Sequence, residues 1–173
     1  MISLAGLCGL LLARDLRAKG NAAGLTVSAA ELCHGINEDR DPEGILKIDD
    51  VVGKRPIYLW TVLSGDLQTL RVLKERGLLP IRHRWYYSPA LKFDEVPSVD
   101  QLVDPKPIRA GTINHLAKLR SEALLHQVFN WRTWSQKSNL QPGIYVVQVT
   151  FQDGSAVLDQ SGKPSEVRFK YEP

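Results

Sequence analysis

Two short blocks of this chain gather the residue types that are able to do chemistry. The first is His83-Arg84-Trp85-Tyr86-Tyr87 and the second is Trp131-Arg132-Thr133-Trp134-Ser135. A histidine next to a serine or a carboxylate can act as a base, and tryptophan and arginine faces stack on sugars, bases or protein side chains. His83 is therefore the candidate reactive residue, and the surrounding aromatic and basic residues are candidates for binding.

No further part of an active site accompanies His83 in the sequence. There is no G-x-S-x-G motif, no glycine-rich phosphate loop after a strand, and no CxxC or HxxxH spacing. Without such a constellation, the sequence predicts no enzymatic activity, no cofactor and no metal site. The alternative is a hydrolase or transferase built on the strand of His83. It requires a serine or a carboxylate within hydrogen-bonding distance of the imidazole.

Alternation along the two blocks predicts a binding face. If both blocks are strands, Arg82, Arg84 and Tyr86 share one side of the first, and Arg132 and Trp134 share one side of the second. Should the two strands lie in one sheet, these five residues form a basic aromatic surface suited to an anionic, aromatic or sugar ligand. The alternative is that most tryptophans fill the core and the arginines lie across the remaining rings.

Composition limits the class of protein. The 173 residues are 43% apolar and 24% charged, which is typical of one ordinary globular domain. The net charge is +3, and no run of lysine and arginine exceeds two residues. The sequence therefore predicts no nucleic-acid partner.

Short β-like runs with turn signals between them predict a mainly β fold. We expect an antiparallel, immunoglobulin-like β-sandwich with one or two short inserted helices and an N-terminal apolar helix. Pro142-Gly143 and Asp153-Gly154 are predicted to turn between antiparallel strands. The expected strands are Leu25–Ile36, Ile45–Val52, Pro56–Leu63, Ile81–Tyr87, Leu91–Val96, Val128–Lys137, Ile144–Phe151, Ser155–Leu158 and Val167–Tyr171. The expected helices run from the N-cap Asp66 to Gly77 and from Ile113 to Gln127, and Ser88–Gly111 is expected to be a surface connection.

The first 24 residues form a separate segment ahead of a single β domain at 25–173. The run Ile2–Ala13 is apolar or small, and it is too short to cross a bilayer, which needs about 20 residues. Three interpretations stay open: a clipped signal or membrane helix, a short helix against a partner, and a start codon placed too far downstream. We expect this run to be helical and docked in a membrane or on another subunit. The candidate anchor residues are Ile2, Leu4, Leu7, Leu10, Leu11 and Leu12.

The order of several short motifs resembles a known bacterial family, the domain of unknown function two-nine-one-four. The motifs are Leu32-Cys33 followed by a charged turn with Pro42, then Tyr58-Leu59-Trp60, the two blocks above, and Pro142-Gly143-Ile144-Tyr145-Val146. The resemblance covers 25–171 and implies a small β domain found on envelope or membrane-attached proteins. The family has no agreed activity and no catalytic residues to carry over. The segment Pro97–Gln127 and the helix near Leu67 depart from its pattern.

Together these features predict a non-catalytic accessory or binding domain of the bacterial envelope. Its expected partner is a membrane-associated protein, with an anionic or sugar ligand also compatible, and its expected location is periplasmic or membrane-associated. The competing hypotheses are a carbohydrate-binding sandwich, which requires an exposed tryptophan, and the His83 hydrolase.

Overall fold

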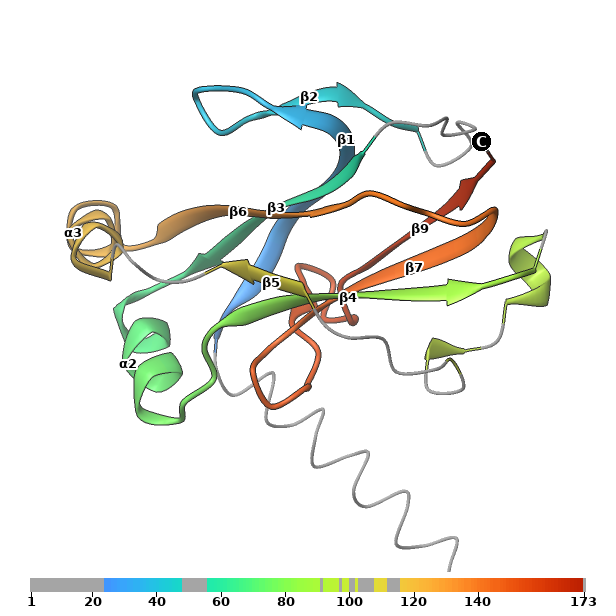
Figure 1. The fold of residues 1–173 in the computed structure, drawn as a ribbon. Coiled ribbons are helices and arrows are strands. Elements are labelled where there is room, and N and C mark those ends of the chain that lie inside the picture. Colours follow the sequence, from blue (N-terminus) through green and yellow to red (C-terminus); the bar gives the residue numbers. More distant parts are fainter. Residues whose placement is uncertain are drawn as a thin grey trace, which may run out of the picture.

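The protein is mainly β and is built from two antiparallel sheets that face each other (Figure 1). The computed structural model describes residues 24–47, 56–90, 92–96, 98–99, 102, 108–111 and 116–172. The first sheet has the order β2 (Pro42–Ile45), β1 (Thr26–Ile36), β3 (Ile57–Gly65), β6 (Phe129–Lys137), with the short β8 (Leu158–Asp159) parallel to the start of β1. The second has the order β5 (Ile108–Gly111), β4 (Ile81–Ser88), β7 (Gly143–Thr150), β9 (Glu166–Tyr171). The prediction of a mainly β, sandwich-like fold with short inserted helices is confirmed.

The core lies between the two sheets. From the first sheet, Leu59, Leu63 and Phe129 point inward and are fully buried. Trp85 and Phe169 face them from the second sheet, with their rings in edge-on contact at 6.1 Å between centroids. Each strand alternates inward and outward residues, so the position of one residue fixes the side on which all its strand neighbours lie.

Both described α-helices lie at one end of the sandwich (Figure 1). Helix α2 (Leu67–Glu75) begins at the predicted N-cap Asp66, whose carboxylate accepts from the Thr69 amide at 2.7 Å. The spacing of Leu67, Leu70 and Leu73 predicts one apolar face for this helix; Leu70 and Leu73 are buried, whereas Leu67 is exposed. Helix α3 (Leu116–His126) buries Leu119 and Ala123, and the first residues predicted for it lie outside the described ones, as does the predicted N-terminal helix with all its anchor residues.

Three predicted elements differ from the structure. The second strand begins at Pro42 and ends at Ile45 in the described residues, because Pro42 itself begins the return from the turn at Asn37–Asp41. Residues 48–52 of the predicted run Ile45–Val52 lie outside the described residues. A short 3-10 helix, η1 (Phe93–Glu95), replaces the strand expected at Leu91–Val96. The expected surface connection contains the edge strand β5, which is short and has no alternating pattern that would reveal it.

One of the two predicted turns joins paired strands and the other does not. Around Asp153-Gly154 the chain folds back tightly, with the Phe151 amide donating to the Ser155 carbonyl and a bridge between Thr150 and Ala156, so this prediction is confirmed. The Pro142-Gly143 prediction is wrong: β6 and β7 belong to different sheets. The polar stretch before Pro142 is long enough to cross between the sheets, and β7, buried on both faces, pairs with β4 and β9 instead.

Tyr145 fixes this crossing. Its hydroxyl accepts from the Gln141 amide at 2.9 Å and donates to the Gln141 carbonyl at 3.2 Å. Its ring stacks on Phe169, with 5.2 Å between centroids. The phenol therefore satisfies backbone groups of the connection while the ring stays in the core.

Trp60 is expected to be a strong determinant of stability. It is only 8% exposed although it lies on the outer face of the first sheet, where its indole donates to the Arg40 carbonyl at 2.8 Å. Trp60→Ala should lower the free energy of unfolding by about 3–5 kcal/mol, measured by denaturant unfolding. Trp60→Phe keeps much of the ring and should cost less. An alanine variant that unfolds at the wild-type midpoint would contradict this burial.

Candidate functional site

The two sequence blocks meet in the core. His83 and Trp85 project inward from β4, and Thr133 and Ser135 project toward them from β6 in the opposite sheet. The Ser135 hydroxyl lies 2.8 Å from His83 Nδ1, and Trp85 Nε1 donates to the same hydroxyl at 3.0 Å. Ser135 therefore connects the two most characteristic side chains of the first block.

The remaining hydrogen bonds fix the direction of every proton in this cluster. The Thr61 hydroxyl donates to the Thr133 carbonyl at 3.2 Å, so it can only accept from His83 Nε2, which is 3.3 Å away. His83 is thus assigned as the Nε2–H tautomer, and its Nδ1 accepts from Ser135. The Thr133 hydroxyl donates in turn to the Ala110 carbonyl on β5. The chain of donors runs from Trp85 through Ser135, His83 and Thr61.

Burial keeps His83 neutral. The side chain has no solvent exposure, and desolvation lowers its pKa to about 3. Its two partners are hydroxyl groups, so no carboxylate compensates a positive charge on the ring. Protonation would also place a hydrogen on Nδ1. Ser135 would then have to accept hydrogen bonds from both Nδ1 and the Trp85 indole, and its own hydroxyl proton would lose its acceptor.

The hydrolase hypothesis meets its geometric condition and still lacks a usable site. Ser135 is the serine that it required, at hydrogen-bonding distance from His83. Both residues are buried, and the Ser135 hydroxyl is fully engaged between Trp85 and His83. A substrate cannot reach this oxygen without opening the core. The cluster acts as a link between the sheets.

The predicted basic aromatic face is not one surface. Arg82, Arg84 and Tyr86 lie on the outer face of the second sheet, whereas Arg132 and Trp134 lie on the outer face of the first. Since β4 and β6 belong to different sheets, the whole core separates the two groups, about 10 Å at the level of the backbones. The alternation within each strand was correct, but the assumption that the strands share a sheet was wrong.

Each half of that face is also partly occupied. Tyr86 is buried, and Arg82 Nε donates to Gln152 Oε1 at 2.9 Å. On the other side, Arg132 Nε lies 3.4 Å from Asp41 Oδ1. These contacts hold the long side chains against their own sheets.

The four tryptophans do not provide a sugar-stacking platform. All four lie in the described part of the chain: Trp85 is in the core, Trp131 packs against it, and Trp60 and Trp134 are cross-strand neighbours on the outer face of the first sheet. None of the four rings is exposed, since Trp131 and Trp134 are half-buried and the other two are buried. A carbohydrate-binding site on a flat, exposed ring therefore has no support here.

Metal-ligating residues are scattered in the described part of the chain. Within it, no group of three or more histidine, cysteine, aspartate or glutamate side chains is arranged to hold a metal ion. Cys33 is buried and unpaired, and burial raises the pKa of its thiol, which makes it a poor nucleophile at neutral pH.

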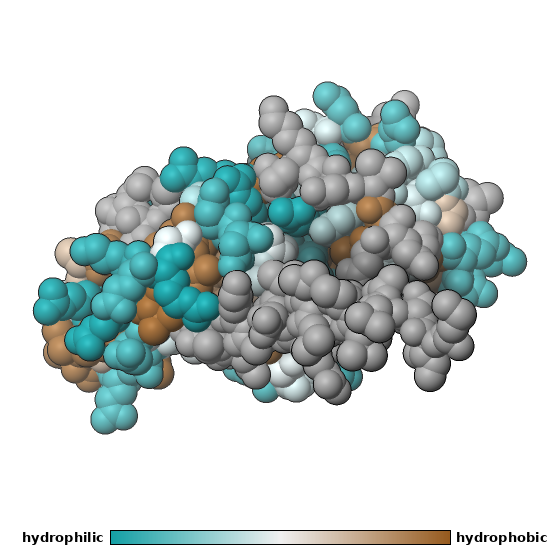
Figure 2. Space-filling model, turned by 90° about the horizontal axis from the view of Figure 1, so that it is seen from below, coloured by the Kyte–Doolittle hydropathy of each residue, from teal (hydrophilic) through white to brown (hydrophobic). Residues whose placement is uncertain are grey.

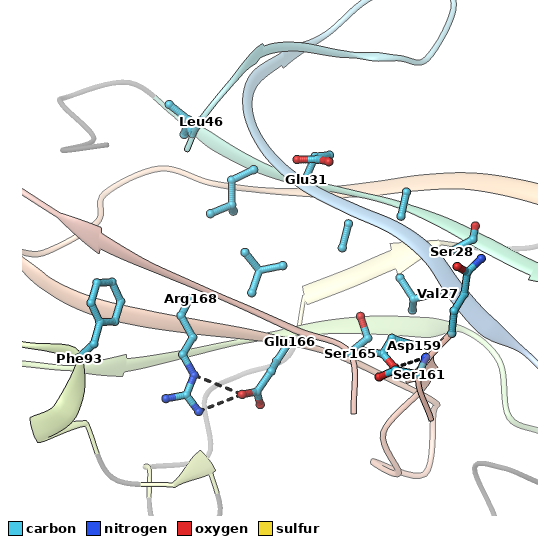
Figure 3. A pocket seen from close by; sticks show the side chains of 15 residues that line it. Val27, Ser28, Glu31, Leu46, Phe93, Asp159, Ser161, Ser165, Glu166 and Arg168 are labelled. Atoms are coloured by element: carbon cyan, nitrogen blue, oxygen red, sulfur yellow. Dashed lines mark hydrogen bonds and ion pairs between the residues drawn. The ribbon is translucent and has the colours of Figure 1, made fainter. Parts of the chain in front are cut away.

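A groove of about 860 Å³ opens between the two sheets at the side where β1 and β9 run (Figure 3). Its floor is apolar and includes Ala30, Leu46 and Val167, which pack against the core and stay partly exposed. The rim carries charged residues, with Glu31 on the side of β1 and the pair Glu166–Arg168 on the side of β9. This concave surface combines accessible apolar area with polar groups at its edges, as binding sites do.

Both walls of this groove are strand edges. Within the described residues, the edge of β1 that faces away from β3 is paired with β8 at Thr26 and Val27 and with β2 from Cys33 onward. Between these points, and before the hydrogen bond from the Leu46 amide to the Leu32 carbonyl, the described structure gives 28–31 a strand partner on the side of β3 alone. Among the described strands, β9 is the last of its sheet and pairs only with β7. Unpaired strand edges are templates for another strand.

A second surface lies at the end formed by α2 and α3, where apolar side chains gather among polar ones (Figure 2). We name it the helical surface and define it by exposed apolar and neighbouring basic residues. The apolar members are Leu67, Leu124, Leu125 and Val128, and the basic members are Arg71, Lys74 and Arg120. Leu124 and Leu125 are 62% and 78% exposed, which is high for leucines in an otherwise well-packed domain. Among the described helices, none has the length and hydropathy needed to cross a membrane.

Sequence reasoning found the residues of the core cluster and missed both surfaces. The sequence shows the alternation that aims His83 and Thr133 inward, but it contains no signal for which strand edges remain unpaired. The two adjacent leucines at 124 and 125 were a usable signal, because two neighbouring positions on a helix cannot both face the same core. Comparisons with protein-family models, with curated proteins and with solved structures find no match to this chain.

His83 should make stability depend on pH. In the unfolded chain the imidazole binds a proton below about pH 6.5, whereas in the folded protein it does so only near pH 3. Its contribution is therefore fully present above pH 6.5 and is lost as the pH falls toward 3, by up to roughly 5 kcal/mol. Denaturant unfolding between pH 7 and 4 should show a flatter dependence for His83→Gln. The exposed His126→Gln is the matched control and should retain the wild-type slope.

Ser135 should be indispensable for the core cluster. Ser135→Ala leaves the Trp85 indole and His83 Nδ1 buried without their partner, and each such group costs about 1–3 kcal/mol. The variant should unfold at a markedly lower denaturant concentration. Ser135→Thr keeps the hydroxyl and should therefore lose less stability than Ser135→Ala. A Ser135→Ala protein as stable as wild type would show that the hydrogen bonds make no net contribution.

Proposed function

We propose that this protein is a non-catalytic accessory domain of the bacterial envelope that lies on a membrane surface through α2 and α3. The observation that carries the proposal is the helical surface, where Leu67 and Leu124 line one hollow with Arg71, Lys74 and Arg120, and with Glu75 as the acidic residue among them. The assignment to the bacterial envelope is supported by the motifs that resemble the domain of unknown function two-nine-one-four. The periplasmic or membrane-associated location is part of the same proposal.

We assign the sandwich to the immunoglobulin-like class. The neighbours β1–β3–β6 and β5–β4–β7–β9 correspond to strands A-B-E and C′-C-F-G of that architecture. Trp85, buried on the strand equivalent to C, is a further point of agreement. The Tyr145 hydroxyl, bonded to the backbone of Gln141 just before the strand equivalent to F, matches the tyrosine corner of such domains. These domains commonly serve as rigid binding modules, which supports an accessory role.

The absence of catalysis is proposed from how the reactive residues are used. His83 and Ser135, the pair most able to act as base and nucleophile, are satisfied by each other and by core hydroxyl groups. The low pKa of His83 follows from desolvation, with no carboxylate to orient or charge it. Catalytic histidines need access to a substrate and a pKa near the working pH. Here the same residues stabilise the sandwich.

The chemistry of the helical surface suits a membrane interface. Leucine side chains can enter the boundary between headgroups and acyl chains, while arginine and lysine reach anionic headgroups. Leu67, Leu124, Arg71 and Arg120 line one hollow between the two helices, so both kinds of side chain are presented together.

The start of the described chain lies beside this surface. A side chain added at Gly24 would meet Thr69 of α2, and Gly24, Thr69 and Val128 line one shallow hollow. The sequence before Gly24 contains the apolar run Ile2–Ala13 and the basic residues that follow it. About ten residues join this run to Gly24, which limits the separation to roughly 35 Å. An apolar run inserted in a bilayer would therefore hold the helical surface close to that bilayer.

Reversal of charge on the helical surface should abolish a preference for anionic lipid. We expect the full chain to partition more strongly into vesicles containing phosphatidylglycerol than into phosphatidylcholine alone, in a flotation assay at low salt. Each basic residue near such a surface contributes about 1 kcal/mol to binding. Arg71→Glu with Arg120→Glu should therefore weaken partition into the anionic vesicles by at least roughly 30-fold.

The matched control reverses two exposed lysines outside the helical surface, Lys92→Glu with Lys163→Glu, and should keep the preference. A further variant, Leu124→Ser with Leu125→Ser, separates apolar from electrostatic binding and should weaken partition into both kinds of vesicle. Equal partition of wild type and the Arg71/Arg120 variant into anionic vesicles would overturn the proposed role of this surface.

A further inference from the structure

We propose that the groove between β1 and β9 binds an extended segment of a partner protein, with alternating apolar and basic residues, as an added strand along β1. This inference goes beyond the membrane placement and uses none of the residues of the helical surface. It is carried by three features of the groove: the unpaired backbone, the apolar floor and the charge of the rim.

The backbone of β1 is oriented to accept a strand. The Leu32 carbonyl points away from β3, since it accepts from the Leu46 amide at 2.8 Å. Backbone groups of an antiparallel strand alternate in direction, so the amide and carbonyl of Ala30 point to the same side as those of Leu32. On this edge the described structure shows no strand partner for 28–31, between the pairing of Val27 with β8 and the hydrogen bond from the Leu46 amide to Leu32. This gap sets the length of the added strand at about four residues.

The floor of the groove offers apolar area that an added strand would cover. Ala30 and Val167 belong to the inward-facing rows of their strands and are only partly buried, as is Leu46 beyond the end of β2. Side chains at every second position of an incoming strand would point at this floor. Covering apolar surface in this way contributes about 25 cal/mol per Å². The requirement for apolar residues at alternate positions follows from the pleat of the strand.

The charge of the rim determines which charged residues are favoured at the remaining positions of the incoming strand. The residues that line the groove include three carboxylates, Glu31, Asp159 and Glu166, and one guanidinium, Arg168 (Figure 3). Arg168 is paired with Glu166 at 2.9 Å, and the Asp159 carboxylate accepts from Ser161 and from the Lys163 amide. The three carboxylates and one guanidinium leave the rim with a net negative charge. Lysine or arginine in the incoming segment would complement it, and acidic residues would be repelled.

A second copy of this chain is a poorer occupant than a separate partner. β9 has a suitable alternation, with Val167, Phe169 and Tyr171 between charged residues. However, Phe169 and Tyr171 are buried in their own core, so β9 cannot present these side chains to another molecule without unfolding. A segment that is extended or disordered in its free form has no such cost of unpacking, which is the usual mode of strand addition.

The test uses the full chain in detergent micelles and fluorescence anisotropy of labelled nine-residue peptides. The probe alternates valine with lysine and arginine. One comparison peptide carries glutamate at the basic positions, and another has the same composition with apolar and basic residues segregated. We expect the alternating basic peptide to bind at least roughly tenfold more tightly than either, because only it meets both the floor and the rim.

Two variants test the backbone and the rim separately. Ala30→Pro removes the amide that would donate to the incoming strand and should weaken binding by roughly tenfold, whereas Ala30→Ser, which keeps the amide, should not. Glu31→Lys with Glu166→Lys should reverse the preference toward the acidic peptide. The matched control, Glu38→Lys with Glu75→Lys, changes exposed carboxylates outside the groove and should leave it unchanged.

Thermal melts establish whether each variant folds. If Ala30→Pro does not fold, the Glu31→Lys and Glu166→Lys variant decides the outcome. Equal binding of basic and acidic peptides, or insensitivity to both variants, would overturn the proposal. Concentration-dependent dimers in sedimentation velocity that the basic peptide dissociates would identify a second copy as the occupant, which also overturns it. None of these results depends on vesicle binding, so this inference and the proposed membrane role can fail independently.

Discussion

The structure depends on a neutral histidine that joins two sheets. His83 comes from the second sheet, and its partners Ser135 and Thr61 come from the first. Polar groups in an apolar core are tolerated only when all their hydrogen bonds are made, and this chain of hydroxyl and ring groups makes them in one consistent direction. Such a chain also fixes the relative position of the sheets, because a shift by one residue would aim Ser135 outward. Apolar packing alone gives no comparable penalty for sliding.

The sequence predicted the features that depend on the alternation of inward and outward side chains along a strand. The inward direction of His83 and Trp85 and the outward direction of Arg132 follow from period-two patterns, and the helix at Asp66 follows from its cap. Alternation does not determine which strands become neighbours. The binding face failed for that reason, since β4 and β6 are paired across the core and not within a sheet. The Pro142-Gly143 turn failed for the same reason, and β5 was too short to have a pattern of its own.

The surfaces that remain available are the places where the sandwich does not close. Strand edges are usually protected by charge, bulges or covering segments, and β1 has a register shift between Val27 and Ala29 just where its unpaired stretch begins. Charged residues at Glu31, Glu166 and Arg168 would discourage indiscriminate pairing between copies. The same charges give a groove the means to distinguish one extended segment from another. Protection against aggregation and selectivity for a partner therefore arise from the same side chains.

The groove and the helical surface share no residues, and this separation has a mechanical consequence. The helical surface occupies the end of the sandwich where β1 begins, and the groove runs along the side of β1 and β9 (Figure 1). A domain lying on a membrane through α2 and α3 would leave that side facing the aqueous phase. The His83 cluster lies between the sheets and resists their sliding, so the distance between the two surfaces is set by the core. A segment captured in the groove would then be held at a fixed height above the membrane, which is what an accessory domain without catalytic chemistry can contribute to an assembly.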